Sequence, residues 1–281
     1  MIGQKELIRH IDKMTGGADI ALPRFIIIVG AKNSGRKMIS SYIAKKAGAT
    51  LVTSDIKVDA IREIIPLAYK QSEPTIYLLP DADKMSPAAK NALLKVTEEP
   101  PRKAYFIMTI QDEQQTLATL RSRGTIMRIN PYTPDELIQY ANRETANFCL
   151  SDYEEAIVSE ICQVPGDVDT LVRYNMKDFY KYIETVIDNI GVVNGANAFK
   201  IGSKLSYKED DGGWDITLFM RAVMAICRNR IDTEPDYAAQ YLASIRTTSK
   251  YLSELAVTGI NKSSTIDMWI LAMRKVWQEV E

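Results

Sequence analysis

The chain has 281 residues, with 35 Lys and Arg against 36 Asp and Glu and a net charge of −1. Its length allows more than one domain, and its near-neutral charge argues against a free-standing nucleic-acid binder, which would show a basic excess. No apolar run approaches the ~18 residues of a membrane-spanning helix, and the three cysteines, Cys149, Cys162 and Cys227, form no CxxC pair. The composition therefore predicts a globular protein of the reducing cytoplasm, with no membrane span and no zinc site.

The first half of the chain predicts alternating helices and buried strands. An amphipathic helix is expected over 6–14, and the apolar run RFIIIV at 24–29 predicts a strand. The loop GAKNSGRK at 30–37 then opens a helix that continues to Lys46. This order is typical of a phosphate-binding P-loop, whose pattern is G-x-x-x-x-G-K-[ST]. Gly30 and Gly35 keep the spacing, but Arg36 stands at the lysine position and Lys37 at the hydroxyl position.

The two changes in the loop alter what it can bind. Backbone N–H groups and the helix N-terminus can still hold phosphate oxygens. The hydroxyl ligand of Mg²⁺ is replaced by the cation Lys37, and the forked guanidinium of Arg36 is a poor substitute for lysine at the β- and γ-phosphates. The sequence leaves two alternatives here: a glycine turn without nucleotide, or a weak, vestigial site for ATP or ADP.

The stretch 75–101, TIYLLPDADKMSPAAKNALLKVTEEPP, is the best-defined part of the sequence. After a short strand at 51–54 and a helix over 57–70, its apolar run at 76–79 predicts another buried strand. Asp81 and Asp83 follow at the strand end, where open α/β sheets bind ligands. Ser86 is placed to cap the next helix, with Pro87 at its first position.

Two more strands complete the predicted sheet, at 104–110 (AYFIMTI) and 126–129, and the segment LATLRSRG at 117–124 lies between them. Together the apolar runs predict a parallel five-stranded sheet between helices. Beyond Pro131 and Pro134 the pattern is helical. Helices are expected over 135–145, 153–164 and 166–173, and 177–188 completes or links this part. The pattern is helical again from Trp214 to Val280, with turns or loops at 191–195 and 208–213.

The pattern ADKM-x-x-x-A-x-NALLK-x-x-EEPP at 82–101 resembles the bacterial DNA polymerase III clamp-loader subunits of the AAA+ class, above all the delta-prime type. The resemblance implies an α/β P-loop AAA+ domain over 1–130. It implies a small all-α lid over 131–190 and an all-α C-terminal collar domain, used for oligomerisation, over 191–281.

The resemblance also implies that the nucleotide site is degenerate. In active relatives an aspartate that holds Mg²⁺ and a glutamate that orients water follow the strand; Pro80 and Asp81 stand there instead. Gln111 is the nearest candidate for the residue that senses the γ-phosphate, and Asp169 stands where hydrolysing members carry an arginine. Phosphoryl transfer depends on the metal, so we expect no metal, no required cofactor and no intrinsic hydrolysis.

A second motif favours a role in a neighbour's site. Ser122-Arg123-Gly124 is similar to the Ser-Arg-Cys element of clamp loaders, with glycine for cysteine. In the family this arginine enters the ATP site of the adjoining subunit, and a permanent charge with a planar fork of donors suits that task. Arg123, next to Ser122, is therefore the expected trans arginine finger, and Arg121 is the competing assignment.

These features predict a non-hydrolysing, delta-prime-like stator of the clamp loader. Its expected partners are the gamma/tau and delta types of loader subunit, the sliding clamp, and primed DNA through the assembled complex. The alternatives are an ATP-hydrolysing gamma/tau-type subunit and a loader component encoded by a phage.

Overall fold

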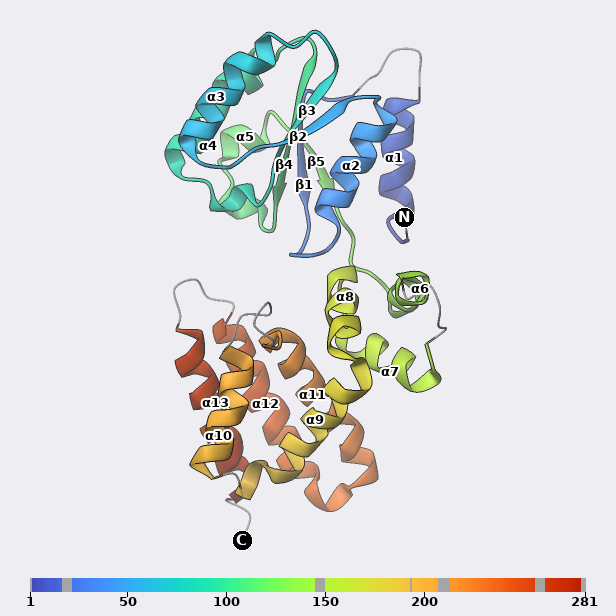
Figure 1. Cartoon of the computed structure of the whole chain (residues 1–281), viewed down its shortest axis with the longest axis vertical. Helices are drawn as coiled ribbons and strands as arrows, with labels where there is room; N and C mark the ends of the chain where they lie inside the picture. Colours follow the sequence, from blue (N-terminus) through green and yellow to red (C-terminus); the bar gives the residue numbers. More distant parts are fainter. Residues whose placement is uncertain are drawn as a thin grey trace. The chain divides into compact units, whose positions relative to one another are not determined.

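The computed structural model describes residues 2–16, 22–144, 150–192, 194–206, 213–255 and 261–278. The chain divides into two compact units. The first holds Met1–Tyr132 and the short stretch Val164–Gly166; the second holds Thr133–Gln163 and Asp167–Glu281. The first unit carries the sheet, and the described part of the second is helical (Figure 1).

The sheet of the first unit has five parallel strands in the order β2-β3-β4-β1-β5. The strands are β1 (Phe25–Val29), β2 (Thr50–Thr53), β3 (Thr75–Leu79), β4 (Ala104–Ile110) and β5 (Thr125–Arg128). The predicted parallel five-stranded sheet is confirmed.

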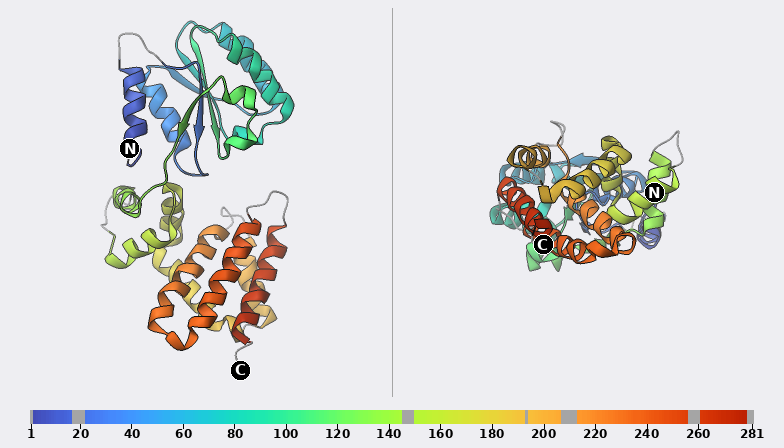
Figure 2. Two further views of the ribbon diagram at one scale, coloured as in Figure 1. Left: turned by 180° about the vertical axis from the view of Figure 1, so that it is seen from behind. Right: turned by 90° about the horizontal axis from the view of Figure 1, so that it is seen from below.

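Helices cover both faces of this sheet (Figures 1 and 2). On one face lie α1 (Lys5–Thr15) and α2 (Arg36–Lys46); on the other lie α3 (Val58–Tyr69), α4 (Pro87–Glu98) and the short α5 (Ala118–Arg121). Because side chains alternate along a strand, β1 buries Ile26 and Ile28 against the first pair of helices and Phe25 and Ile27 against the others. Burial on both faces explains why these strands appear in the sequence as continuous apolar runs.

Helix α4 begins as the sequence predicts. The Ser86 Oγ accepts a hydrogen bond from the backbone N–H of Ala89 at 3.2 Å, and Pro87 occupies the first turn. A cap of this kind stabilises a helix by about 1 kcal/mol. Between β3 and α4 lies the single turn η1 (Ala82–Lys84), and η2 (Glu113–Gln115) follows β4.

The second unit is built of helices over its described residues, which confirms the predicted all-α part. In chain order they are α6 (Pro134–Glu144), α7 (Asp152–Ile161), α8 (Pro165–Tyr174), α9 (Met176–Asn189), η3 (Ile190–Val192), α10 (Gly195–Ser206), α11 (Ile216–Thr233), η5 (Pro235–Tyr237), α12 (Ala238–Leu255) and α13 (Lys262–Gln278). The first two residues of α8 are counted with the first unit. The sequence had predicted only a turn at 191–195; the structure places η3 there and begins α10 at Gly195. Cys149, the loop over 208–212 and Val280 lie outside the described residues.

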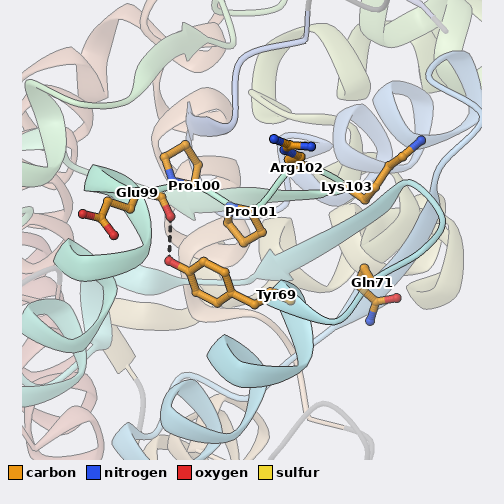
Figure 3. A pocket seen from close by; sticks show the side chains of 8 residues that line it. Tyr69, Gln71, Glu99, Pro100, Pro101, Arg102 and Lys103 are labelled. Carbon is orange, nitrogen blue, oxygen red and sulfur yellow. Dashed lines mark hydrogen bonds between the residues drawn. The ribbon is translucent and has the colours of Figure 1, made fainter.

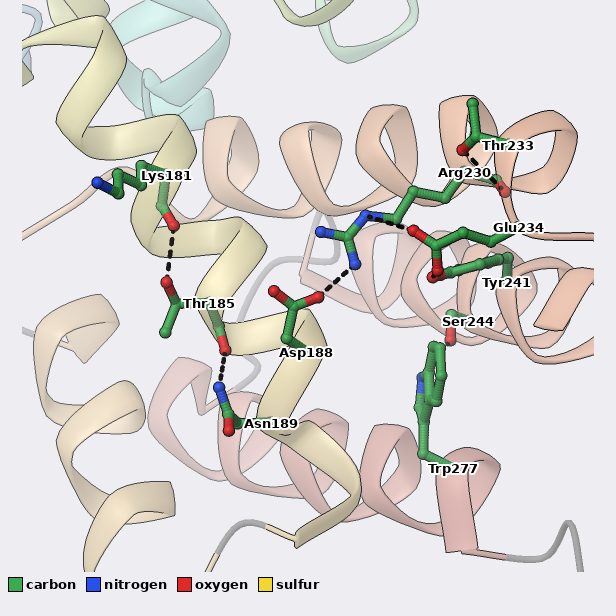
Figure 4. A network of polar contacts seen from close by, with 10 residues as sticks. All are labelled: Lys181, Thr185, Asp188, Asn189, Arg230, Thr233, Glu234, Tyr241, Ser244 and Trp277. Atoms are coloured by element: carbon green, nitrogen blue, oxygen red, sulfur yellow. Dashed lines mark hydrogen bonds and ion pairs between the residues drawn. The ribbon is translucent and has the colours of Figure 1, made fainter.

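Helix α11 packs against α12, and α13 packs against α12 and α10. Helices α7 and α9 also contact α11, and the predicted division of the helical part at residue 190 stays a prediction. A polar network crosses this packing (Figure 4). Arg230 of α11 pairs with Asp188 of α9, and its Nε lies 3.9 Å from the Glu234 Oε1. The Trp277 Nε1 donates to the Ser244 Oγ at 3.0 Å and so joins α13 to α12. Among the described helices, none combines the length and apolar character needed to cross a bilayer.

Candidate functional site

The glycine loop lies between β1 and α2, and its shape depends on both glycines. Gly35 has φ +91°, which disfavours any side chain. A Cβ on Gly30 would lie 2.7 Å from the Ser34 Oγ, and the Gly30 N–H donates to the Ile110 carbonyl at 3.1 Å. The loop therefore makes a tight turn from the end of β1 to the N-terminus of α2.

Arg36, which stands at the P-loop lysine position, is joined to Asp81 at the end of β3. The Arg36 Nη2 lies 2.7 Å from the Asp81 Oδ1, and only 7% of the Arg36 side chain is exposed. The Lys84 Nζ approaches the other carboxylate oxygen of Asp81 at 3.6 Å. The Asp81 backbone N–H donates to the Thr109 Oγ1 at 3.1 Å, which fixes the turn after β3 against β4. The carboxylate of Asp81 is thus neutralised by cations of its own chain.

The side chains at the two positions predicted to hold Mg²⁺, Pro80 and Lys37, offer it no oxygen ligand. Metal binding here requires a free carboxylate and a hydroxyl ligand. Asp81 is paired with Arg36, Pro80 has no side-chain oxygen, and Lys37 is an exposed cation in the first turn of α2. No group of three or more His, Cys, Asp or Glu side chains that could hold a metal occurs in the part of the chain that the structure describes.

Two buried polar atoms at the loop, the Ser34 Oγ and the Arg36 Nη1, make no hydrogen bond within the described structure. Both groups could donate a hydrogen bond to a phosphate oxygen near the N-terminus of α2. The two alternatives for this loop, an empty turn and a vestigial nucleotide site, therefore stay predictions.

The groups that contact the glycine loop from elsewhere in the chain could not be predicted from the sequence. The Tyr132 hydroxyl donates to the Ser34 carbonyl at 3.0 Å. The Gly166 N–H donates to the Asn33 carbonyl at 3.2 Å, and a Cβ on Gly166 would lie 2.4 Å from the Asn33 Cβ. Gly166 is separated by more than 100 residues of sequence from the loop, and no local pattern announces such a contact.

The two positions that the resemblance links to the γ-phosphate are Gln111 and Asp169. Gln111 is exposed just beyond β4, while Thr109, two residues earlier, is 1% exposed and contacts the turn at Asp81. Asp169 accepts a hydrogen bond from the Tyr140 hydroxyl at 3.0 Å within the second unit. Their roles toward a nucleotide stay predictions.

Arg123 lies in the turn between α5 and β5, and its side chain contacts its own chain. The Nη1 donates to the Thr119 carbonyl at 2.9 Å, and the Nη2 lies 2.8 Å from the Glu98 Oε1 at the end of α4. The side chain is 34% exposed. The Ser122 Oγ donates to the same Thr119 carbonyl at 3.1 Å, whereas the Arg121 Nε is buried without a partner in the described structure. Of the two arginines, Arg123 is exposed and Arg121 is half-buried.

The residue after Arg123 is a glycine, Gly124, because the backbone at this position lies close against β1. A Cβ at this position would lie 2.8 Å from the Cγ1 and the Cδ1 of Ile27 and 3.1 Å from the Phe25 Cδ1. Ile27 is fully buried in the core under α4 and α5. The glycine in the Ser-Arg-Gly element is therefore explained by packing in this chain.

An open pocket of about 520 Å³ lies next to the start of β4, at the amino ends of the strands (Figure 3). The Tyr69 hydroxyl donates to the Glu99 carbonyl at 2.6 Å across it. Pro100, Pro101 and Arg102 line the same hollow. Because the strands are parallel, this pocket and Asp81 lie at opposite ends of the strands. We assign the pocket no role.

Part of this sequence is similar to the sequences of known proteins. The family model described as "DNA polymerase III, delta subunit" matches residues 25–133. The DNA polymerase III subunit delta' of Yersinia pestis is 42% identical over 73 residues, which are 25% of this chain and 22% of that protein. The match thus spans about a fifth of the relative's length.

Solved structures show the same fold at low identity. The RuvB Holliday junction branch migration motor of Thermotoga maritima superposes with a TM-score of 0.54 at 14% identity, over 83% of this chain and 77% of that one. A DNA polymerase III gamma subunit-related protein, also from Thermotoga maritima, gives 0.52 at 17% identity, over 97% and 99%. The predicted α/β fold is confirmed, and residues 25–133 of this chain resemble the DNA polymerase III clamp-loader subunits, with delta' subunits among the similar proteins.

Proposed function

We propose that this protein is a non-hydrolysing stator subunit of the DNA polymerase III clamp loader that lends Arg123 to the ATP site of a neighbouring subunit. The observation that carries the proposal is the Arg36–Asp81 pair at 2.7 Å. It joins the residue at the phosphate-binding lysine position to the residue at the water-orienting position. A site whose cation and carboxylate satisfy each other has little left with which to organise Mg²⁺ and water for hydrolysis.

The supply of Arg123 in trans is supported by its chemistry and exposure. A guanidinium is always charged and can grip a phosphate through two N–H groups. The Arg123 side chain is 34% exposed and lies in a short turn, where its Nη1 donates to the Thr119 carbonyl. An arginine supplied in trans accelerates phosphoryl transfer by about 10³–10⁵-fold.

The expected partners are gamma/tau-type and delta-type loader subunits, the sliding clamp and primed DNA, all within the cytoplasm. The charge of each unit supports contact with DNA in the assembly. Residues 1–132 contain 20 Lys and Arg against 13 Asp and Glu, a net charge of +7, and the remaining residues carry 15 against 23, a net charge of −8. The near-zero net charge of the whole chain therefore hides a basic AAA+ unit, which suits phosphate contacts.

Reconstitution with gamma/tau-type and delta-type subunits tests the proposal, with ATP turnover measured with and without clamp and primed DNA. The isolated chain should show no turnover, and Arg123→Ala should lower the stimulated rate by at least ~10²-fold. Arg128→Ala is the matched control, because Arg128 is an exposed arginine of the same unit that is paired with Glu113, and it should leave the rate unchanged.

The competing function is an ATP-hydrolysing gamma/tau-type subunit. It is favoured if the isolated chain hydrolyses ATP at a rate that falls in Arg36→Ala. The stator role requires the reverse order, with Arg36→Ala nearly unchanged per folded chain and Arg123→Ala strongly impaired. Equal effects of the two substitutions would contradict it. A phage-encoded loader component would behave in the same way as a host one in this assay.

A further inference from the structure

Glu98 is the only acidic side chain with a described contact to Arg123, and its position in α4 is unfavourable by itself. It is the last residue of the helix and is followed by the exposed Glu99. Negative charges at a helix C-terminus are disfavoured by the helix dipole. The nearby guanidinium of Arg123 offsets this, since the Arg123 Nη2 and the Glu98 Oε1 lie 2.8 Å apart.

The contacts of Arg123 occupy the nitrogens that would grip a phosphate. A guanidinium has five N–H donors, and in this chain the Nη2 donates to Glu98 while the Nη1 donates to the Thr119 carbonyl. A phosphate bound by both η nitrogens would meet the carboxylate of Glu98 at close range, and two anions repel each other there. Engagement of a phosphate by both η nitrogens therefore competes with the Arg123–Glu98 pair.

From this geometry we infer that Glu98 is a latch that holds Arg123 on its own chain until the phosphate of a nucleotide in the neighbouring subunit displaces it. The inference rests on the proposed function. Glu98 acts through Arg123 and is a positioning residue. The exchange is one of anions on a single cation: the Nη2–Oε1 hydrogen bond breaks and an N–H to phosphate oxygen bond forms, with no net change of charge on the arginine.

The pair is partly exposed, with 34% of the Arg123 and 53% of the Glu98 side chain accessible. Exposed ion pairs contribute little and are screened by salt. The latch therefore lowers the affinity of Arg123 for the neighbouring site by only about two- to fivefold. It leaves the rate at saturation unchanged.

The test is a titration of the reconstituted ATPase with wild-type chain, Glu98→Gln and Glu99→Gln. The Glu98→Gln variant keeps the shape of the side chain and removes its charge. It should lower the concentration for half-maximal stimulation about two- to fivefold at low salt with the same maximal rate, and the difference should shrink as salt rises. Glu99→Gln removes a neighbouring charge whose side chain has no described partner, and it should behave as wild type.

A readout on the free chain separates a latch from a structural role. The guanidinium resonances of Arg123 in NMR spectra should show restricted rotation in the wild type and faster rotation in Glu98→Gln. An unchanged half-maximal concentration in Glu98→Gln, or equal changes in Glu98→Gln and Glu99→Gln, would overturn the latch. If Arg123→Ala stimulates as well as wild type, the proposed function itself fails; if Arg123→Ala is inactive and Glu98→Gln behaves as wild type, only the latch fails.

Discussion

Arg36 and Asp81 are 45 residues apart in sequence and form one ion pair at the mouth of the glycine loop, with the Arg36 Nη2 2.7 Å from the Asp81 Oδ1. Each residue taken alone is a departure from the pattern of an ATP site. Together they form a structural contact that ties the N-terminus of α2 to the end of β3. The loop is thus held in place by a contact within this chain.

This pair should contribute measurable coupling to stability. Arg36 is 93% buried, whereas 39% of the Asp81 side chain is exposed, so we expect Arg36→Met and Asp81→Asn each to lower the free energy of unfolding by about 1–3 kcal/mol, less than for a fully buried pair. Asn is the suitable replacement at Asp81 because the residue has φ +48°, which Asn tolerates. Chemical denaturation of the two single variants and the double variant measures the coupling. Simple additivity of the two losses would show that the pair is not a working interaction.

Gly124→Ala should destabilise the first unit because its Cβ would lie 2.8 Å from Ile27. Overpacking of this kind costs about 1–3 kcal/mol, and Gly124→Cys, which carries the residue usual in the family, should cost at least as much. The measurement is the midpoint of thermal or denaturant unfolding. Ile27→Val should partly rescue Gly124→Ala, because it removes the Cδ1 that the new methyl group meets. A Gly124→Ala variant as stable as wild type would show that the backbone moves away from β1.

The sheet could be predicted almost to the residue because its strands are buried on both faces. The run AYFIMTI coincides with β4 at 104–110, and the predicted bounds of β1 and β3 differ from the observed ones by one residue. Helix α10 escaped prediction since its segment GANAFKIGSKLS buries few large side chains, among them Ile201 and Leu205. Its stability depends on packing against α13, which no local pattern records.

The candidate site could be predicted in its residues but not in its contacts. The spacing of Gly30 and Gly35, together with the residues that follow them, predicts a degenerate P-loop, and this stays a prediction. The partnership of Arg36 with Asp81, and that of Arg123 with Glu98, depend on which side chains the fold brings together. In the sequence, Glu98 is only the first residue of the EEPP run that ends a helix. Its position next to the Ser-Arg-Gly turn follows from the contact of α4 with α5.

The two described cysteines should react only after the second unit unfolds. Cys227 is fully buried, and burial raises the pKa of its thiol to about 12; burial, with a smaller effect of the Asp167 carboxylate, also raises the pKa of Cys162. The thiolate is the reactive form, so little of either thiol is reactive at pH 8. In a Cys149→Ser background, a thiol reagent at pH 8 should label the native chain slowly and both cysteines quickly in denaturant. Rapid labelling of native protein would contradict the packing around α7 and α11.

The N-terminus of α7 carries a pH-dependent cap whose loss should be measurable. The Ser151 Oγ accepts from the Glu154 N–H at 3.4 Å, while the Glu154 carboxylate accepts from the Ser151 N–H at 2.9 Å and from its hydroxyl at 2.7 Å. The bonds from the Ser151 side chain and backbone lower the pKa of Glu154 from its ordinary value of 4.5, against the opposing effect of burial. A lowered pKa in the folded state means that the carboxylate stabilises the fold above about pH 4.5 and that this contribution is lost as the pH falls below that value.

Ser151→Ala should therefore lower the free energy of unfolding by about 1 kcal/mol at pH 7, as for other N-caps, and by less near pH 3.5, where Glu154 becomes protonated in the unfolded state and then in the folded one. Denaturant unfolding of wild type and variant at the two pH values measures the difference. Ser159→Ala is the control within the same helix, because the Ser159 hydroxyl only donates back to the Ala156 carbonyl at 2.8 Å, and its effect should not change with pH. A loss in Ser151→Ala that is the same at both pH values would show that the serine acts without the carboxylate of Glu154.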